Sequence, residues 1–275
     1  MHRLRIPTRK DVSRAGIRLL QILYRHRPAP LRPIFLLREL TNCEDSLFPE
    51  TLPFIATSKE LHNPFLKEKL VGFEFGRWSL GVKSLALVEG KLRKVKPQGV
   101  VEFGSGLSTI CLAQYMQELY GDENQIRVIS IDQGLPYIEE TMRLLESLGL
   151  NKLVLFIHAP LRRQVIEGHE TICYGLEKQG LESSFKNLRP TFVLVDGPAA
   201  EFGARFGTLP LVYPFLGKEC HFLLDDALRD GELWIAQQWL RLPYLRLEGI
   251  YLKEKGLLAG RTVSSPSQPC VRDIN

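Results

Sequence analysis

From residue 99 onward, short apolar runs alternate with longer stretches in which apolar and polar residues follow a helical period. The apolar runs predict strands at 99–103, 127–132, 152–161, 191–198 and 221–227. The longer stretches predict helices at 79–95, 110–120, 136–148, 205–216 and 231–240. Strands and helices that alternate in this way form a parallel sheet with helices on both faces.

Two segments of this region depart from the regular alternation. The runs YLRLEGIYL and GLLAGRTV predict a terminal pair of strands, which brings the mostly parallel sheet to seven strands. Residues 162–190 are rich in polar residues and glycine and predict a loop on the substrate side of the sheet. The whole pattern favours a doubly wound α/β domain that spans residues 76–275.

The N-terminal part of the chain has a different pattern, and we expect a partly helical extension over residues 1–75. Residues 34–75 are irregular and predict a wrapping segment with a short helix near 58–70. Residues 12–25 predict an amphipathic helix with arginines on its polar side. Such a helix binds an anionic membrane or a polyanion, or it docks its apolar side on the main domain or on a second subunit. We also expect a homo-oligomer.

Positive charge is concentrated in this extension. Residues 1–32 hold nine Lys and Arg residues and one Asp, whereas the whole chain has a net charge of only +5. The remainder of the chain is therefore mildly acidic and offers no general surface for phosphates, so we expect no nucleic-acid substrate.

Composition excludes several classes of protein. Apolar residues make up 44% and charged residues 24% of the chain, which is ordinary globular usage rather than that of a disordered or fibrous chain. No apolar run reaches the length of a membrane-spanning helix, and the first residues lack the apolar core of a signal peptide. The 5 cysteines form no C-x-x-C pair and indicate free thiols. We therefore expect a cytoplasmic protein.

Polar residues gather where the predicted strands end. The clusters that follow the strands are Glu102–Gly106, Asp132, His158, Asp196 and Asp225–Asp226. In open α/β sheets, ligands bind in the crevice outside the carboxyl ends of the strands. The sequence thus predicts a site at one edge of the sheet.

The first of these clusters, VVEFGSGLST, predicts a ligand-binding loop. Gly104 and Gly106 permit a tight turn with bare backbone, and Ser108 or Thr109 can cap the next helix. Glu102 stands two places before the first glycine, where its carboxylate would repel a pyrophosphate but accept a hydrogen bond from an ammonium group. With Asp132 placed to hold ribose hydroxyls, the expected ligand is a nucleoside with a cationic amino-acid end.

E-x-G-x-G at 102–106, ISID, HAPL, VLVDGPAA and LLDDALRDGE together resemble the class I S-adenosylmethionine-dependent methyltransferases, in their order and spacing, over about residues 76–260. The resemblance implies a Rossmann-like sheet and S-adenosyl-L-methionine as cofactor. It implies that the 102–106 segment holds the amino-acid end, that Asp132 holds the ribose and that His158 and Ala159 border the adenine. The implied cofactor-binding residues are Glu102, Gly104, Ser105, Gly106, Ser108, Thr109, Asp132, Gln133, His158, Ala159 and Asp196.

Three carboxylates end two neighbouring predicted strands. Because adjacent parallel strands lie about 4.8 Å apart, Asp196, Asp225 and Asp226 should converge, and such oxygen-rich sites suit Mg²⁺ or Ca²⁺. The arrangement resembles the divalent-metal site of catechol-type and macrolide-sugar O-methyltransferases. Alternatively, Asp196 serves the cofactor or substrate directly and the Asp-Asp pair caps a helix.

The sequence leaves open which residue would act as the base in methyl transfer. Catechol-type enzymes carry a lysine just after the aspartate of the fourth strand, but this chain reads Asp-Gly-Pro-Ala-Ala-Glu there. The local candidates for a base are Asp196, Asp226, Glu201 and His158, of which we take Asp196 and Asp226 as the predicted catalytic residues.

The leading hypothesis is O-methylation of a small polyhydroxylated acceptor, such as a sugar, a glycan or a natural product, with Mg²⁺ as a candidate second cofactor. One alternative is an NAD-dependent oxidoreductase or epimerase on a similar sheet, and another is a non-catalytic scaffold that binds S-adenosylmethionine. Arg162, Arg163, Tyr174 and Arg205 lie in or beside the predicted substrate zone. Arginines there would suit an acidic acceptor, although solvated surface charge is the default explanation.

Overall fold

A computed structural model describes eight parts of the chain: residues 54–55, 74–75, 79–121, 125–186, 188–200, 202–252, 254–264 and 269–273. The predicted helices at 12–25 and 58–70, the domain boundary after residue 75 and the candidate base Glu201 lie outside these residues and stay predictions. Within the described ranges, no helix is long and apolar enough to cross a membrane.

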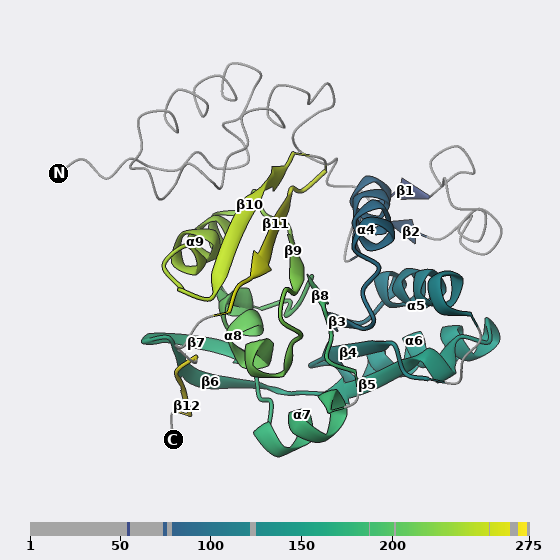
Figure 1. The fold of residues 1–275 in the computed structure, drawn as a ribbon, viewed down its shortest axis with the longest axis horizontal. Helices are drawn as coiled ribbons and strands as arrows, with labels where there is room; N and C mark the ends of the chain where they lie inside the picture. The colour runs from purple at the N-terminus through teal and green to yellow at the C-terminus, as the bar shows by residue number, and fades with distance from the viewer. Residues whose placement is uncertain are drawn as a thin grey trace.

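A seven-stranded sheet forms the centre of the molecule, in the order β10-β11-β9-β8-β3-β4-β5 (Figure 1). Its strands are β3 (Val100–Phe103), β4 (Val128–Asp132), β5 (Val154–His158), β8 (Phe192–Val195), β9 (His221–Asp225), β10 (Leu245–Tyr251) and β11 (Leu257–Thr262). The first five are parallel, and the terminal pair is antiparallel. The predicted fold class is confirmed for the domain: a doubly wound, mostly parallel α/β sheet.

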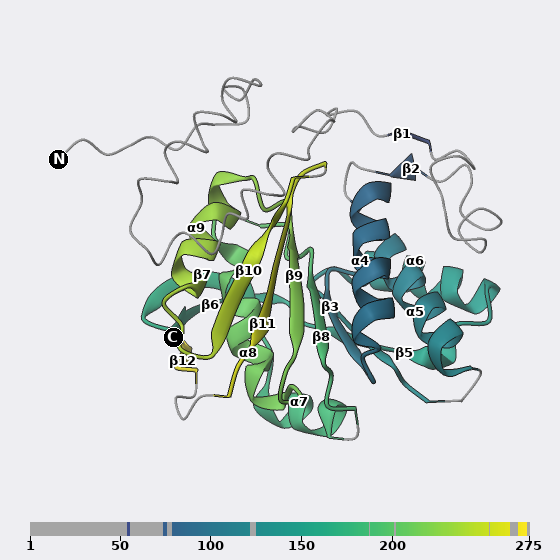
Figure 2. The same cartoon turned by 45° about the horizontal axis from the view of Figure 1, so that its top comes forward.

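Helices cover both faces of this sheet (Figures 1 and 2). One face carries α4 (Val82–Val95), α5 (Leu107–Tyr120) and α6 (Leu135–Ser147), and the other carries α8 (Thr208–Val212) and α9 (Asp230–Trp239). Alternate strand residues therefore enter different cores: Val101 and Phe103 pack on the α9 side, whereas Val100 packs on the α5 side. This alternation decides where the polar residues of the strands point.

The predicted loop at 162–190 is wrong. The segment forms a hairpin of β6 (Leu161–Ile166) and β7 (His169–Tyr174), followed by α7 (Lys178–Phe185). Glu167 and Gly168 make its two-residue turn with φ of 51° and 79°, a pair of positive values that suits a tight hairpin. A third strand, β12 (Val271–Asp273), pairs antiparallel with β6.

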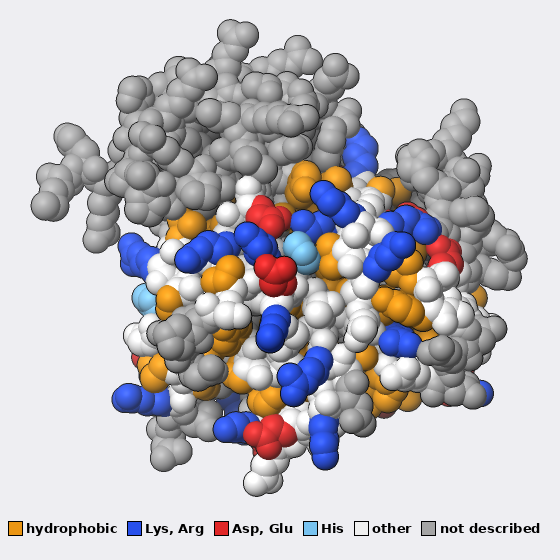
Figure 3. Space-filling model, viewed as in Figure 1, with side chains coloured by type: hydrophobic (Ala, Val, Ile, Leu, Met, Phe, Trp, Pro, Cys, Tyr) orange, Lys and Arg blue, Asp and Glu red, His pale blue; other side chains and the backbone are white. Residues whose placement is uncertain are grey.

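Other elements are short. The helix predicted at 205–216 is split into η3 (Ala204–Gly207), α8 and η4 (Tyr213–Phe215), with Pro214 in the first turn of η4. A 3-10 turn, η2 (Asn151–Leu153), precedes β5, and β1 (Phe54–Ile55) pairs antiparallel with β2 (Glu74–Phe75). On the face seen in Figure 3, Lys and Arg side chains are interspersed with acidic, polar and apolar ones.

Candidate functional site

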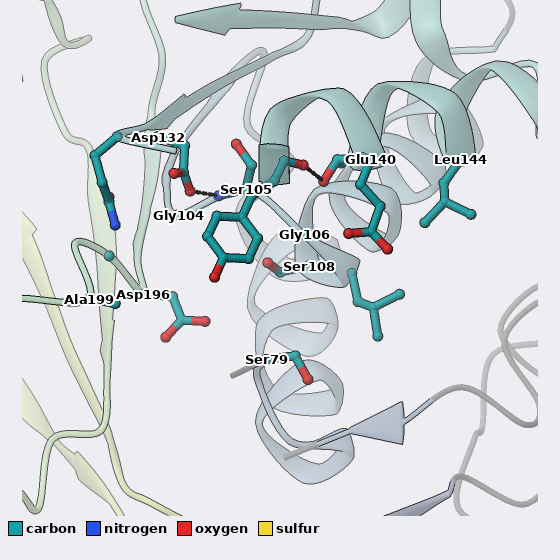
Figure 4. Close-up of a pocket in the computed structure, with 15 residues that line it drawn as sticks. Ser79, Gly104, Ser105, Gly106, Ser108, Asp132, Glu140, Leu144, Asp196 and Ala199 are labelled. Atoms are coloured by element: carbon teal, nitrogen blue, oxygen red, sulfur yellow. Dashed lines mark hydrogen bonds between the residues drawn. The ribbon is translucent and has the colours of Figure 1, made fainter. Parts of the chain in front are cut away.

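A cavity of about 580 Å³ lies outside the carboxyl ends of β3, β4 and β8. This volume is within the range of about 300–1,000 Å³ that is typical of small-molecule sites. In Figure 4, Asp196 and Ala199 lie on one side of the cavity and Glu140 and Leu144 lie on the other. The loop after β3 contributes Gly104, Ser105, Gly106, Leu107 and Ser108 to its wall.

Asp132, at the end of β4, holds the wall of the cavity together. Its Oδ2 accepts a hydrogen bond from the backbone N–H of Ser105 at 2.7 Å (Figure 4). Its Oδ1 accepts one from the N–H of Gly134 at 2.7 Å. The carboxylate thus binds the loop after β3 to the loop after β4. It lines the cavity while only 4% exposed.

Glu102 lies beneath the loop rather than in the cavity wall. It is fully buried, and its Oε2 accepts hydrogen bonds from Thr109 Oγ1 at 2.5 Å and from Ser130 Oγ at 3.1 Å. Burial raises the pKa of Glu102 to about 8, against the hydrogen bonds that favour its ionised form. The side chain points to the α5 face because Val101 and Phe103 take the other one. The structure therefore does not bring Glu102 to the position that a direct contact with an ammonium group needs.

Thr109 is likewise buried and serves the loop from below. Its Oγ1 accepts the N–H of Gly106 at 3.0 Å, which caps the first turn of α5. Ser108, by contrast, lines the cavity. Of the two predicted capping residues, the structure assigns the capping hydrogen bond to Thr109.

Neither of the two residues predicted to border the adenine, His158 and Ala159, lies in the cavity wall. Gln133 lines the cavity, whereas His158 is exposed and its Nε2 lies 3.1 Å from the carbonyl oxygen of Gln133. Ala159 is buried and, like His158, is not in the cavity wall. The sequence reasoning missed four lining residues on α6, which are Tyr137, Glu140, Thr141 and Leu144. Their spacing places them on one side of a helix, which is the signal that could have found them.

The three predicted metal-ligating residues do converge. Asp196, Asp225 and Asp226 each place a carboxylate oxygen within 4.8 Å of the others. Asp196 lies at the cavity, whereas Asp225 and Asp226 are buried behind it at 1% and 2% exposure. Burial raises the pKa of Asp196 and of Asp225, and repulsion between the carboxylates raises both further.

A buried arginine lies among these carboxylates. Arg205, whose side chain is 7% exposed, places Nη2 3.2 Å from Asp226 Oδ2 and 3.6 Å from Asp196 Oδ1. The default explanation of surface charge is therefore wrong for Arg205, although it holds for the exposed Arg162 and Arg163. Tyr174 is fully buried and stacks on Phe103 with ring centroids 5.4 Å apart.

The charge of the cavity is one-sided. Among the described residues that line it are three carboxylates, Asp132, Glu140 and Asp196, and no Lys, Arg or His. Acidic walls attract cationic ligands and repel phosphates. The cavity therefore suits a ligand that carries positive charge.

Comparisons with known proteins support the fold. No protein-family model matches the chain, and no curated protein matches it significantly. Among solved structures, the O-methyltransferase TomG from Streptomyces achromogenes, involved in tomaymycin synthesis and in complex with SAM, matches with a TM-score of 0.50 at 13% identity, over 86% of this chain and 100% of its own. A methyltransferase from Geobacter sulfurreducens matches with a TM-score of 0.47 at 19% identity, over 66% of this chain and 79% of its own. The O-methyltransferase from Bacillus cereus in complex with SAH matches with a TM-score of 0.47 at 13% identity, over 68% and 84%. The domain thus has the Rossmann-like fold found in TomG.

Proposed function

We propose that this protein is an S-adenosyl-L-methionine-dependent methyltransferase that binds its cofactor in the cavity outside β3 and β4. The observation that carries the proposal is the charge of the cavity wall, where Asp132, Glu140 and Asp196 are opposed by no cation among the described lining residues. The cofactor carries a sulfonium and an ammonium group, which acidic walls favour. The same carboxylates would repel the negatively charged diphosphate of NAD, which disfavours the oxidoreductase alternative.

The residues of the loop after β3 fit this cofactor. Asp132 accepts two backbone N–H groups and keeps further lone pairs for ribose hydroxyls, because each carboxylate oxygen can accept more than one hydrogen bond. Apart from its chain neighbours and the backbone of its own helix, no atom of the described residues lies within 4 Å of a Cβ added to Gly106, so its backbone is open to a ligand. We assign Glu102 a supporting role, since it holds Thr109 and Ser130 under the loop.

Asp196 is the proposed base. When bound, S-adenosyl-L-methionine would supply a sulfonium methyl group for transfer to a hydroxyl oxygen of the acceptor. That hydroxyl group would lose its proton to the base. Asp196 lies at the cavity, and its raised pKa makes its carboxylate a stronger proton acceptor than an exposed aspartate. Asp226, predicted as a second catalytic residue, is buried behind Asp196 and ion-paired to Arg205, so we assign it to positioning.

The acceptor, the partners and the location are the finer parts of the proposal. We keep a small polyhydroxylated acceptor as the substrate class, because a carboxylate base at the cavity suits a hydroxyl nucleophile. The predicted homo-oligomer, the cytoplasmic location and the membrane or subunit contact through residues 12–25 stay predictions. The predicted Mg²⁺ has to compete with the cations already among the three aspartates, and no step of the transfer is assigned to it.

Isothermal titration calorimetry with S-adenosylhomocysteine tests the proposal, with NAD⁺ as the control ligand. We expect saturable binding of S-adenosylhomocysteine with a Kd of micromolar order and no binding of NAD⁺ in the same range. Tighter binding of NAD⁺ would favour the oxidoreductase, and a folded protein that binds neither nucleotide would favour the scaffold.

A further inference from the structure

We propose that the guanidinium of Arg205 occupies the place of a divalent cation among Asp196, Asp225 and Asp226, so that this site needs no bound metal. The proposal concerns the cation of the cluster and rests on the proposed function only for the role of Asp196 toward the acceptor. Arg205 belongs to η3, the short helix that follows the loop after β8.

One guanidinium contacts the carboxylates of Asp196 and Asp226 and the backbone of Asp225. Its Nη2 lies 3.2 Å from Asp226 Oδ2 and 3.6 Å from Asp196 Oδ1, while Nη1 donates to the backbone carbonyl oxygen of Asp225 at 3.0 Å. Nη1 also lies 3.6 Å from Glu232 Oε1. Guanidinium presents donors in a planar fork and stays protonated in proteins, so it is a permanent cation held in a fixed position.

Two further cations surround Asp226. Arg229 Nη1 lies 2.7 Å from Asp226 Oδ2, and Lys255 Nζ lies 3.7 Å from Asp226 Oδ1. Both oxygens of this carboxylate therefore face side-chain cations. A divalent metal needs several oxygens turned toward it and is repelled by neighbouring positive charge. Two of the three carboxylates, those of Asp196 and Asp226, are thus already paired with cations, which disfavours Mg²⁺ between them, while the buried carboxylate of Asp225 has no hydrogen-bond partner among the described residues.

These contacts hold the side chain of Asp196 in one position at the cavity. The guanidinium joins Asp196 at the cavity to Asp226 and Glu232 in the interior, which are anchored in the loop after β9 and in α9. Arg205 is thus a positioning residue that orients the proposed base. A metal-dependent site would instead place its cation between the aspartates and the acceptor.

Binding of Mn²⁺ tests the proposal without any measurement of activity. Free Mn²⁺ is followed by electron paramagnetic resonance in titrations of the wild-type full chain, Arg205→Met and Arg229→Met. The last variant is the matched control, because it removes a second cation from Asp226 but leaves the Arg205 guanidinium in place among the aspartates. We expect no saturable Mn²⁺ binding below about 1 mM in the wild type and in Arg229→Met. Arg205→Met should bind one Mn²⁺ at least about tenfold more tightly than the wild type.

Two results would overturn the proposal. One is stoichiometric Mn²⁺ binding to the wild type that Asp225→Asn abolishes, and the other is a folded Arg205→Met that binds no Mn²⁺. If Arg205→Met fails to fold, as judged by circular dichroism, Arg205→Gln replaces it and the wild-type titration still decides the first point. A parallel titration with S-adenosylhomocysteine separates the two proposals. If the protein binds no S-adenosylhomocysteine but the three proteins bind Mn²⁺ as expected, only the proposed function is refuted.

Discussion

A Cβ atom built on Gly104 would lie 3.0 Å from the backbone nitrogen of Gly197, and one built on Gly197 would lie 3.0 Å from Gly104 Cα. The loops after β3 and β8 therefore touch through bare backbone. The N–H groups of Asp196 and Gly197 both donate to the carbonyl oxygen of Phe103, at 2.9 and 2.7 Å. This contact sets the distance between the loop after β3 and Asp196, the proposed base.

Gly104→Ala should destabilise the protein. Gly104 has φ of +100°, which L side chains rarely adopt, and the added methyl group would press on the backbone of Gly197. We expect the free energy of unfolding to fall by about 1–3 kcal/mol. Urea denaturation followed by circular dichroism measures this loss.

Gly106→Ala is the matched control for that variant. Its φ of 163° is extended backbone, and in the described part of the chain nothing beyond its immediate neighbours lies within 4 Å of the new Cβ, so stability should change by less than about 0.5 kcal/mol. If the cofactor lies against this loop, the same methyl group should lower the affinity for S-adenosylhomocysteine. Unchanged affinity would show that the ligand does not approach Gly106.

Glu102→Gln should change the pH dependence of stability. Burial raises the pKa of Glu102 from 4.5 to about 8 in the folded protein. The folded state then holds a proton that the unfolded state releases, so the stability that this group contributes is present below pH 4.5 and is lost as the pH rises toward 8. We expect the free energy of unfolding of the wild type to fall relative to Glu102→Gln by up to about 1.4 kcal/mol per pH unit in this window.

The measurement is urea denaturation of both proteins at several pH values from 5 to 8, a range set by the two pKa values. Because Asp196 and Asp225 also have raised pKa values, only the difference between the two proteins reports on Glu102. Glu139→Gln, on the exposed side of α6, serves as the surface control. If the free energies of unfolding of the wild type and Glu102→Gln changed with pH in parallel, the raised pKa of Glu102 would be contradicted.

The sheet was predictable because its parallel strands are buried on both faces. Val100, Val101 and Phe103 are all fully buried, so β3 appears in the sequence as an apolar run broken only by Glu102. The hairpin of β6 and β7 was missed for the opposite reason. Arg162 and Arg163, which follow one another and so lie on opposite faces of β6, are both exposed, and their charge hides the strand behind a polar composition.

The site was predictable where it depends on the ends of strands. Neighbouring parallel strands bring Asp196 and Asp225 together whatever the loops do, and the sequence shows both. The position of Arg205 was not predictable, since its contacts with Asp226 and Glu232 depend on the packing of η3 against β7 and α9. Nor could spacing alone show that Glu102 lies below the loop, because that follows from which face of β3 meets α5.

Tyr174→Phe should stabilise the protein. Its hydroxyl is buried and has no hydrogen-bond partner among the residues that the structure describes, so the phenol loses hydration without compensation. Removal of such a group should raise the free energy of unfolding by about 1 kcal/mol.

Tyr244→Phe is the control with the opposite expected sign. The buried hydroxyl of Tyr244 donates to Glu167 Oε1 at 2.7 Å, and its loss should lower the free energy of unfolding by about 1–3 kcal/mol. Thermal unfolding ranks the two variants against the wild type, and a destabilised Tyr174→Phe would mean that this hydroxyl has a partner.

Asp132→Asn should weaken the binding of S-adenosylhomocysteine by about 100-fold. The amide keeps one acceptor oxygen, so it can bond the N–H of Ser105 or that of Gly134 but not both, and it removes the charge expected to hold the ribose. Loss of hydrogen bonds to a charged group costs about 1.5–3 kcal/mol, and about 2.7 kcal/mol corresponds to a factor of 100 in Kd. Isothermal titration calorimetry on samples with matched thermal unfolding measures the change.

Glu140→Gln tests whether any carboxylate of the cavity wall would give that result. Glu140 also lines the cavity but is exposed on α6, where solvent screens its charge. We expect the affinity of this variant for S-adenosylhomocysteine to change by less than about fivefold, since an exposed charge pair contributes at most about 1 kcal/mol. Equal losses in Asp132→Asn and Glu140→Gln would point to the total charge of the cavity. A loss confined to Asp132→Asn would assign the binding to the end of β4.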